Sequence, residues 1–175
     1  MLAAGLRAEL VIEITGGATR PIPIGIVPFG WAGSEQQPAD IAAIVRSDLT
    51  GSGRFNALDQ SDMLEQPTRG VDIDFDNWRM VAVDYVLVGE LAQDGETFSI
   101  RYQLFDVYGG RQVVADQLLL ERRDMRAAGH RVADSVYEAI TGIPGVFNTK
   151  IAYISVSGVP PQQQYQLIVA DADGN

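Results

Sequence analysis

Apolar and polar residues alternate in the segment Glu9–Ile14, close to the start of the chain. Leucine or isoleucine stands at positions 10, 12 and 14, and this period of two is typical of a half-buried strand. Gly16 and Gly17 then interrupt the pattern. The sequence therefore predicts a short strand that a glycine pair separates from the next segment.

A second strand is predicted at Ile22–Phe29, where isoleucine stands at positions 22, 24 and 26. Pro21, Pro23 and Pro28 remove backbone donors in or beside this segment, which favours an edge strand or an irregular one. The next residues, WAGSEQQP at 31–38, are interpreted as a loop.

The first helix is predicted after this loop, because apolar residues recur at positions 41, 44, 45 and 49. Pro38 suits the first helical position, where its missing N–H is no loss, and Asp40 suits the positive end of the helix dipole in the first turn. Gly51 and Gly53 can supply the left-handed conformation that ends the helix.

A series of strands is predicted between this helix and a second one. A short helix around Trp78, capped by Asp74 or Asp76, interrupts the series. The Asp94-Gly95 pair is a strong hairpin signal, so the last three strands form an antiparallel meander. The predicted strands are Arg54–Asp59, Tyr85–Leu91, Thr97–Asp106 and Arg111–Glu121.

The second main helix has the clearest pattern in the chain. Its apolar stripe runs from Met125 to Ile140 at helical spacing, Asp124 begins it, and Gly142 followed by Pro144 ends it. Two main helices and about five strands in mixed order predict an α/β fold with a sheet that has parallel and antiparallel parts.

The pattern changes after Gly145. Two further strands, around residues 149–158 and 164–175, flank a loop that contains Pro160 and Pro161. Two strands alone are only marginally stable, so this end of the chain is interpreted as the first piece of a larger unit.

Composition and charge narrow the function classes. The net charge of −10 disfavours binding to nucleic acid or to an anionic lipid surface, and no apolar run approaches the ~20 residues that a spanning helix needs. Cysteine is absent, which removes disulfides, thiolate nucleophiles and cysteine-based zinc sites. Residues 1–8, MLAAGLRA, are similar to the tail of a secretory signal peptide, and an arbitrary leader is the alternative.

Candidate chemistry is sparse. His130 is the only histidine, with Asp134 one helical turn away, and a locally bonded histidine at the edge of the helix's apolar face is favoured over a general base. Trp31 is interpreted as a lid over the core or, less favoured, as part of a binding pocket. The alternating acids of VDIDFD at 71–76 lack the glycine and closing glutamate of a calcium loop, which favours a solvated loop and a helix cap. We therefore predict no catalytic residue, metal site or cofactor.

Several separate motifs together resemble the TolB family, the periplasmic components of the Tol-Pal system. They are PIGIVPFGWAG, PADIAAIVRSDLTGSGRFNALD, DYVLVGEL, YQLFDV and AGHRVADSVYEAITGIPGVFNTKIAYIS, in this order along residues 9–175. The resemblance implies a mixed five-stranded sheet with two main helices, similar to the anticodon-binding fold, followed by the first strands of a β-propeller. It divides the chain into a leader (1–8), an arm (9–20), an α/β domain (21–146) and opening propeller strands (147–175).

The same resemblance implies a non-enzymatic periplasmic adaptor that supports outer-membrane integrity and constriction during cell division. The arm would bind the C-terminal domain of TolA, and the part of the propeller that this chain lacks would bind Pal. The alternative is a small-ligand-binding or hydrolytic domain with a pocket near Trp31 and His130. The arm residues that match the family's TolA-binding segment are Glu9, Leu10, Val11, Ile12, Glu13, Ile14, Thr15, Gly16 and Gly17.

Overall fold

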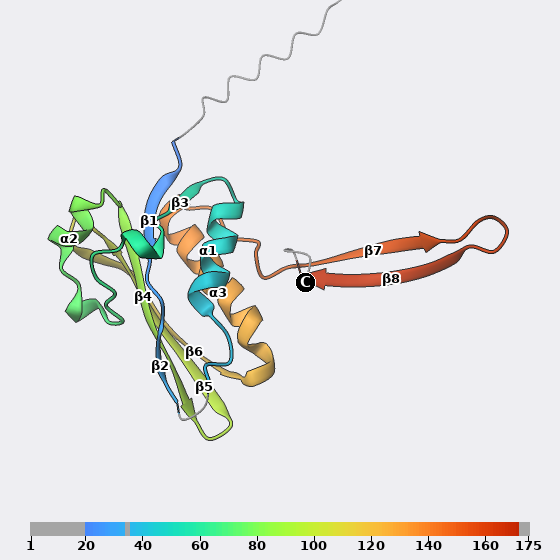
Figure 1. Ribbon diagram of the computed structural model, residues 1–175, viewed down its shortest axis with the longest axis horizontal. Coiled ribbons are helices and arrows are strands. Elements are labelled where there is room, and N and C mark those ends of the chain that lie inside the picture. The colour runs from blue at the N-terminus through green and yellow to red at the C-terminus, as the bar shows by residue number, and fades with distance from the viewer. Residues whose placement is uncertain (1–19, 34–35, 172–175) are drawn as a thin grey trace, which may run out of the picture.

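Figure 1 shows a computed structural model of the protein, which describes residues 20–33 and 36–171. An α/β domain is followed by a two-stranded hairpin that projects from it. The domain's sheet has the strand order β3-β1-β4-β5-β6, and a sixth, short strand, β2, pairs with β4. Its strands are β1 (Ile22–Ile26), β2 (Gly30–Ala32), β3 (Phe55–Ala57), β4 (Tyr85–Asp94), β5 (Thr97–Asp106) and β6 (Arg111–Glu121). The predicted mixed sheet is confirmed, with β2 in addition to the five strands expected.

β1 is an interior strand, which excludes the first of the two alternatives predicted for this segment, an edge strand or an irregular one. It pairs in parallel with β3 on one side and with β4 on the other. The prolines are tolerated because of where they lie: Pro21 and Pro28 fall outside the strand, and Pro23 precedes the first β1–β4 pair, at Ile24. The carbonyl of Pro23 still accepts a 2.9 Å hydrogen bond from the Asp84 N–H. The missing proline donors therefore break no bond of the ladder.

The predicted meander is confirmed in β4, β5 and β6, which pair antiparallel over nearly their whole lengths. Gly95, with φ +61°, turns the chain between β4 and β5, where a residue with a side chain would be strained. β6 is the outer strand of this antiparallel part.

Two long helices, α1 (Ile41–Gly51) and α3 (Met125–Thr141), pack against each other and against one face of the sheet. α1 begins three residues later than predicted: Asp40 is the N-cap and accepts the Ala43 N–H at 2.9 Å, and Pro38 precedes the helix. Gly142, with φ +71°, ends α3 as predicted.

The sheet separates two apolar clusters. Leu87 and Leu91 point toward α1 and α3, whereas Val86 and Val88 point to the opposite face. On that opposite face the short helix α2 (Phe75–Met80) covers only one end of the sheet, burying Trp78. Three 3₁₀ turns complete the domain: η1 (Gln60–Asp62), η2 (Gly70–Asp72) and η3 (Arg122–Asp124).

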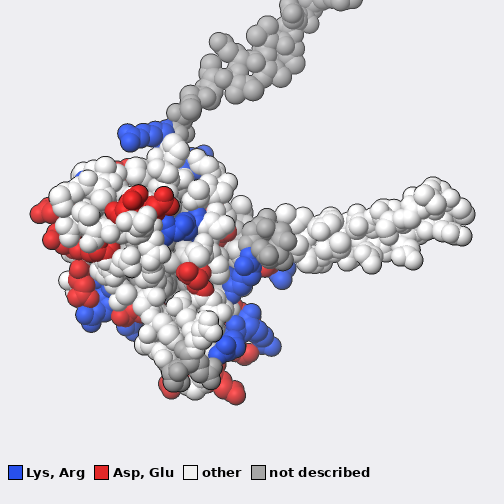
Figure 2. Space-filling view, viewed as in Figure 1, with Lys and Arg blue, Asp and Glu red and all other residues white. Residues whose placement is uncertain are grey.

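The hairpin consists of β7 (Lys150–Ser157) and β8 (Gln164–Asp171), which confirms two strands at this end of the chain. It stands away from the domain in Figure 1, and Figure 2 shows that its surface is almost free of charged side chains. Apolar residues are exposed on both of its faces, for example Tyr153 on one and Leu167 on the other, at 49% and 72%.

Candidate functional site at the base of the arm

The predicted TolA-binding residues, Glu9–Gly17, lie outside the described residues, of which Arg20 is the first. From there the chain enters β1 at once. The Ile22 N–H donates to the Arg54 carbonyl at 2.8 Å, and the Pro23 carbonyl accepts from Asp84. The arm is therefore attached to a strand whose backbone is bonded on both sides from its first residues.

A hollow of about 320 Å³ lies where the arm joins the domain. Arg20 and Asp84 give it a positive and a negative side chain, and Tyr108, which is 59% exposed, contributes an aromatic ring. Ala82, on the same wall, has φ +55°, a conformation that is uncommon for a residue with a side chain. The base of the arm is thus bordered by groups that can meet both polar and apolar parts of a neighbouring segment.

His130 lies in the interface between α1 and α3, and its partner is Asp48 of α1. The distance from Nδ1 to the carboxylate is 2.7 Å, and His130 is only 2% exposed. The prediction of a locally bonded histidine at the edge of the helix's apolar face was wrong, because the partner is distant in sequence and both groups are buried. Asp134, the partner considered from the sequence, instead accepts the backbone N–H groups of Phe147 and Asn148.

Asp48 was missed, although the sequence carries a signal for it. It lies seven residues after Ile41, on the apolar side of α1, between positions that are fully buried. An acidic residue on the buried stripe of a helix requires a polar partner inside the fold. The single histidine of the chain is the group that provides one.

Trp31 lies in β2, which corrects its placement in a loop. Its indole stacks on Phe98 with ring centroids 6.4 Å apart, and the guanidinium of Arg122 lies 5.5 Å from the Phe98 centroid on β5. Trp31 therefore covers the edge of the core, as favoured from the sequence, and His130 is enclosed between helices. This packing gives no support to a shared pocket near the two residues.

The acids of the VDIDFD segment have separate structural roles. Asp74 caps α2 by accepting the Asp76 N–H, Asp72 pairs with Arg69, and Asp76 pairs with Arg79. Within residues 20–33 and 36–171 no three histidine or acidic side chains are grouped so that they could hold a metal ion.

Two side chains of the meander have shifted pKa values. Hydrogen bonds from the Gly109 N–H, together with the nearby Arg111 guanidinium, lower the pKa of Asp106 at the β5–β6 turn. Burial raises the pKa of Tyr102, which faces α3. Among the described residues, neither side chain lies in a cluster of an acid, a base and a nucleophile, so both pKa shifts are interpreted as structural.

None of the helices in the described part of the chain is long and apolar enough to cross a membrane.

Comparison with known proteins gives one consistent result. The profile of the family described as "TolB amino-terminal domain" matches residues 10–113. The chain is 43% identical, over all of its length, to the Tol-Pal system protein TolB of Thioalkalivibrio sulfidiphilus and 38% identical, over 98% of its length, to that of Xanthomonas oryzae pv. oryzae. It spans only 41% and 40% of these two relatives. Among solved structures, TolB from Acinetobacter baumannii matches with a TM-score of 0.75 and 32% identity, over 93% of this chain and 39% of that one.

Proposed function

The chain belongs to the TolB amino-terminal domain family, and from this premise we propose that it serves as a non-enzymatic adaptor of the Tol-Pal envelope system in the periplasm. Its role there is to help maintain outer-membrane integrity and constriction during cell division. The observation that carries the proposal is the family match, which includes most of the arm and begins at residue 10.

The arm, residues 9–20, binds the C-terminal domain of TolA in this proposal. Its alternating pattern suits strand addition, in which an extended segment pairs its backbone with the edge of a partner's sheet. Leu10, Ile12 and Ile14 would share one face and enter an apolar groove, while Glu9 and Glu13 would meet basic groups or water. Gly16 and Gly17 would let the segment change direction before it reaches β1.

Residues 147–175 form the opening strands of a β-propeller in this proposal, and Pal binds the part of the propeller that the chain does not contain. Support comes from the hairpin itself. Between residues 150 and 171 the only charged side chains are Lys150 and Asp171, both at its base, and apolar residues occupy both faces. An isolated two-stranded hairpin is marginally stable, and its apolar faces require cover from further strands.

Communication between the two partners would occur by a population shift. Binding of Pal would change the balance between a docked and an exposed arm, and it can do so only by its differential affinity for the two states. Each tenfold change in the exposed fraction requires about 1.4 kcal/mol. The arm must therefore be held weakly.

The test is calorimetric titration of the chain with a TolA C-terminal domain. Deletion of Glu9–Gly17 is expected to abolish binding and to leave the melting temperature nearly unchanged, because the domain's core lies in the described residues. Undiminished binding after the deletion would contradict the proposal.

A matched pair of substitutions tests the mode of binding. Ile12→Asn places an amide on the face predicted to enter the groove, whereas Val11→Asn changes the opposite face. The first is expected to weaken binding roughly tenfold or more and the second by less than threefold, since burial of an unpaired amide costs about 1–3 kcal/mol. Equal effects would exclude strand addition with this orientation.

The alternative, a small-ligand or hydrolytic site near Trp31 and His130, is disfavoured by the packing of the two side chains described above. His130→Ala is therefore expected to leave TolA binding unchanged at temperatures where the variant is folded.

A further inference from the structure

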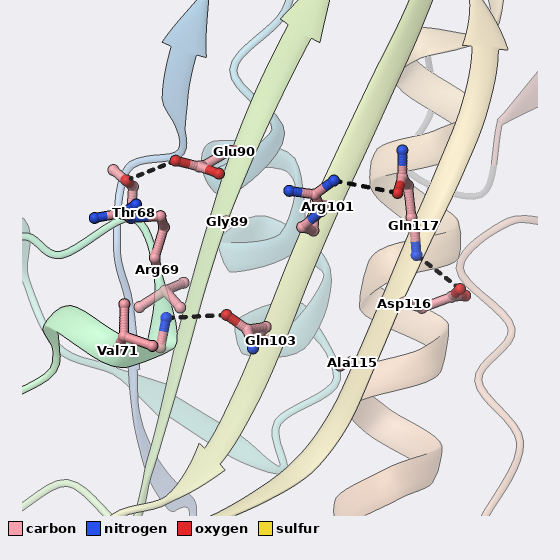
Figure 3. A pocket seen from close by; sticks show the side chains of 12 residues that line it. Thr68, Arg69, Val71, Gly89, Glu90, Arg101, Gln103, Ala115, Asp116 and Gln117 are labelled. Carbon is pink, nitrogen blue, oxygen red and sulfur yellow. Dashed lines mark hydrogen bonds between the residues drawn. The ribbon is translucent and has the colours of Figure 1, made fainter.

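A cavity of about 450 Å³ lies on the face of the sheet opposite α1 and α3, beyond the part that α2 covers. Its floor consists of two rows of cross-strand neighbours from β4, β5 and β6. The first row is Val88, Gln103 and Ala115, and the second row is Glu90, Arg101 and Gln117. Figure 3 shows the labelled side chains of both rows on neighbouring strands.

The segment Thr68–Val71 forms one wall of the cavity and is fixed to the sheet. The Gly70 N–H donates to Gln103 Oε1 at 2.9 Å, and a Cβ on Gly70 would lie only 2.2 Å from the ring of Phe105. The close contact requires glycine here, so the wall is part of the folded domain. Val71 remains 86% exposed at the rim, where it offers apolar surface to a ligand.

The second row carries opposite charges that do not pair with each other. Glu90 and Arg101 are directly opposite in the β4–β5 register, a position in which such side chains usually interact. Within the described part of the chain, however, Glu90 accepts from Thr68 and Arg101 donates to Gln117, each at 3.4 Å. In Figure 3 the two head groups point to different sides. Both bonds are at the long end of the hydrogen-bond range, so both charges keep capacity for a better partner.

The other cation of the cavity is already engaged. Arg69 bonds Asp72 through Nε at 2.9 Å and through a second nitrogen at 3.3 Å. Arg101 is therefore the cation best placed to receive an anionic group on the floor, and Glu90 is the carboxylate best placed to receive a cationic one.

We propose that this cavity binds a short apolar peptide with free termini, of about two residues. Its carboxylate pairs with Arg101, its ammonium with Glu90, and its side chains lie against the exposed Ala115 and Val71. Two extended residues span about 7 Å, which suits two head groups that diverge from Cβ atoms about 5 Å apart. The proposal goes beyond the adaptor role and does not depend on the arm.

The experiment is calorimetric titration of the whole chain with leucyl-leucine, its N-acetyl derivative and its C-terminal amide. The free dipeptide is expected to bind, and each blocked form to bind about tenfold more weakly, because each lacks one charge-assisted hydrogen bond. Arg101→Gln is expected to remove the preference for the free carboxylate, and Glu90→Gln the preference for the free ammonium. Each variant thus identifies the terminus that its side chain recognises.

Arg131→Gln is the matched control, because Arg131 is exposed on α3 and lines a different groove on the opposite side of the sheet. It is expected to bind the dipeptide as the unchanged chain does. Absence of binding up to about 10 mM dipeptide would overturn the proposal. Equal binding of free and blocked dipeptides, or unchanged preferences in the Arg101 and Glu90 variants, would also overturn it.

Discussion

The buried pair of Asp48 and His130 joins the two long helices, and its removal is the sharpest test of how the domain is held together. Both side chains are less than 10% exposed, and the bond between them is 2.7 Å long. When one partner is replaced by alanine, the other loses this bond in a place that bulk water does not reach. A buried polar group that loses its partner costs about 1–3 kcal/mol.

We expect Asp48→Ala and His130→Ala each to lower the free energy of unfolding by about 3 kcal/mol, at the upper end of that range because of the nearly complete burial. The helices cannot close around the gap easily. Gly129, beside His130, already lies so close to α1 that an added Cβ would approach Ile44 to 2.9 Å. For a chain of this size, about 3 kcal/mol corresponds to a fall in melting temperature of roughly 6–12 °C.

The assay is a double-mutant cycle measured by urea unfolding. If the two side chains act as a pair, the double variant is expected to be only slightly less stable than either single variant, with a coupling energy of about 2–3 kcal/mol. Glu138→Ala, an exposed change on α3, is the control and is expected to stay within about 0.5 kcal/mol of the unchanged chain. Costs that add within about 0.5 kcal/mol would refute the pairing argument, and so would a single-variant loss below about 1 kcal/mol.

Three further predictions concern glycine, acid stability and the two faces of β6. Gly70→Ala is expected to lower the free energy of unfolding in urea by about 1–3 kcal/mol, because the added Cβ would clash with the ring of Phe105. Gly51→Ala has open space around it and is expected to be neutral or to stabilise the chain by up to about 1 kcal/mol. The lowered pKa of Asp106 adds stability that is present above its ordinary value of 3.8 and is lost as pH falls through the folded-state pKa. In acid titrations followed by circular dichroism, the stability difference between the unchanged chain and an Asp106→Asn variant should therefore shrink below about pH 4. Leu118→Lys should destabilise the domain by more than about 3 kcal/mol, because the Leu118 side chain is only 8% exposed. Leu119→Lys should destabilise it by less than about 0.5 kcal/mol, because Leu119 is 69% exposed. Similar melting temperatures for the two variants would contradict the register of β6.

Periodicity predicted the elements of this domain well where one face of each element is buried. The apolar stripe of α3, the alternation of β5 and the turn at Gly95 all depend on neighbours within a few residues. Local patterns of this kind are visible in the sequence because they reflect the geometry of a single helix or hairpin.

The predictions that were wrong concern residues whose structure depends on contacts between distant segments of the chain. The prolines around β1 suggested an edge, but the strand is interior: Pro21 and Pro28 lie outside it, and Pro23 precedes its first pair with β4. Trp31 was placed in a loop because a three-residue strand such as β2 leaves almost no periodic signal and forms only against β4.

The features of the candidate sites also separate into those that the sequence shows and those that depend on tertiary contacts. The sequence alone determined the alternation of the arm, its glycine pair and the family to which the chain belongs, since these are properties of residues in order. Only the tertiary structure decided that His130 pairs with Asp48 rather than Asp134, and that Glu90 and Arg101 face each other across two strands without pairing. Partners far apart in sequence are selected by packing and strand register, and neither is written in the spacing of residues along the chain.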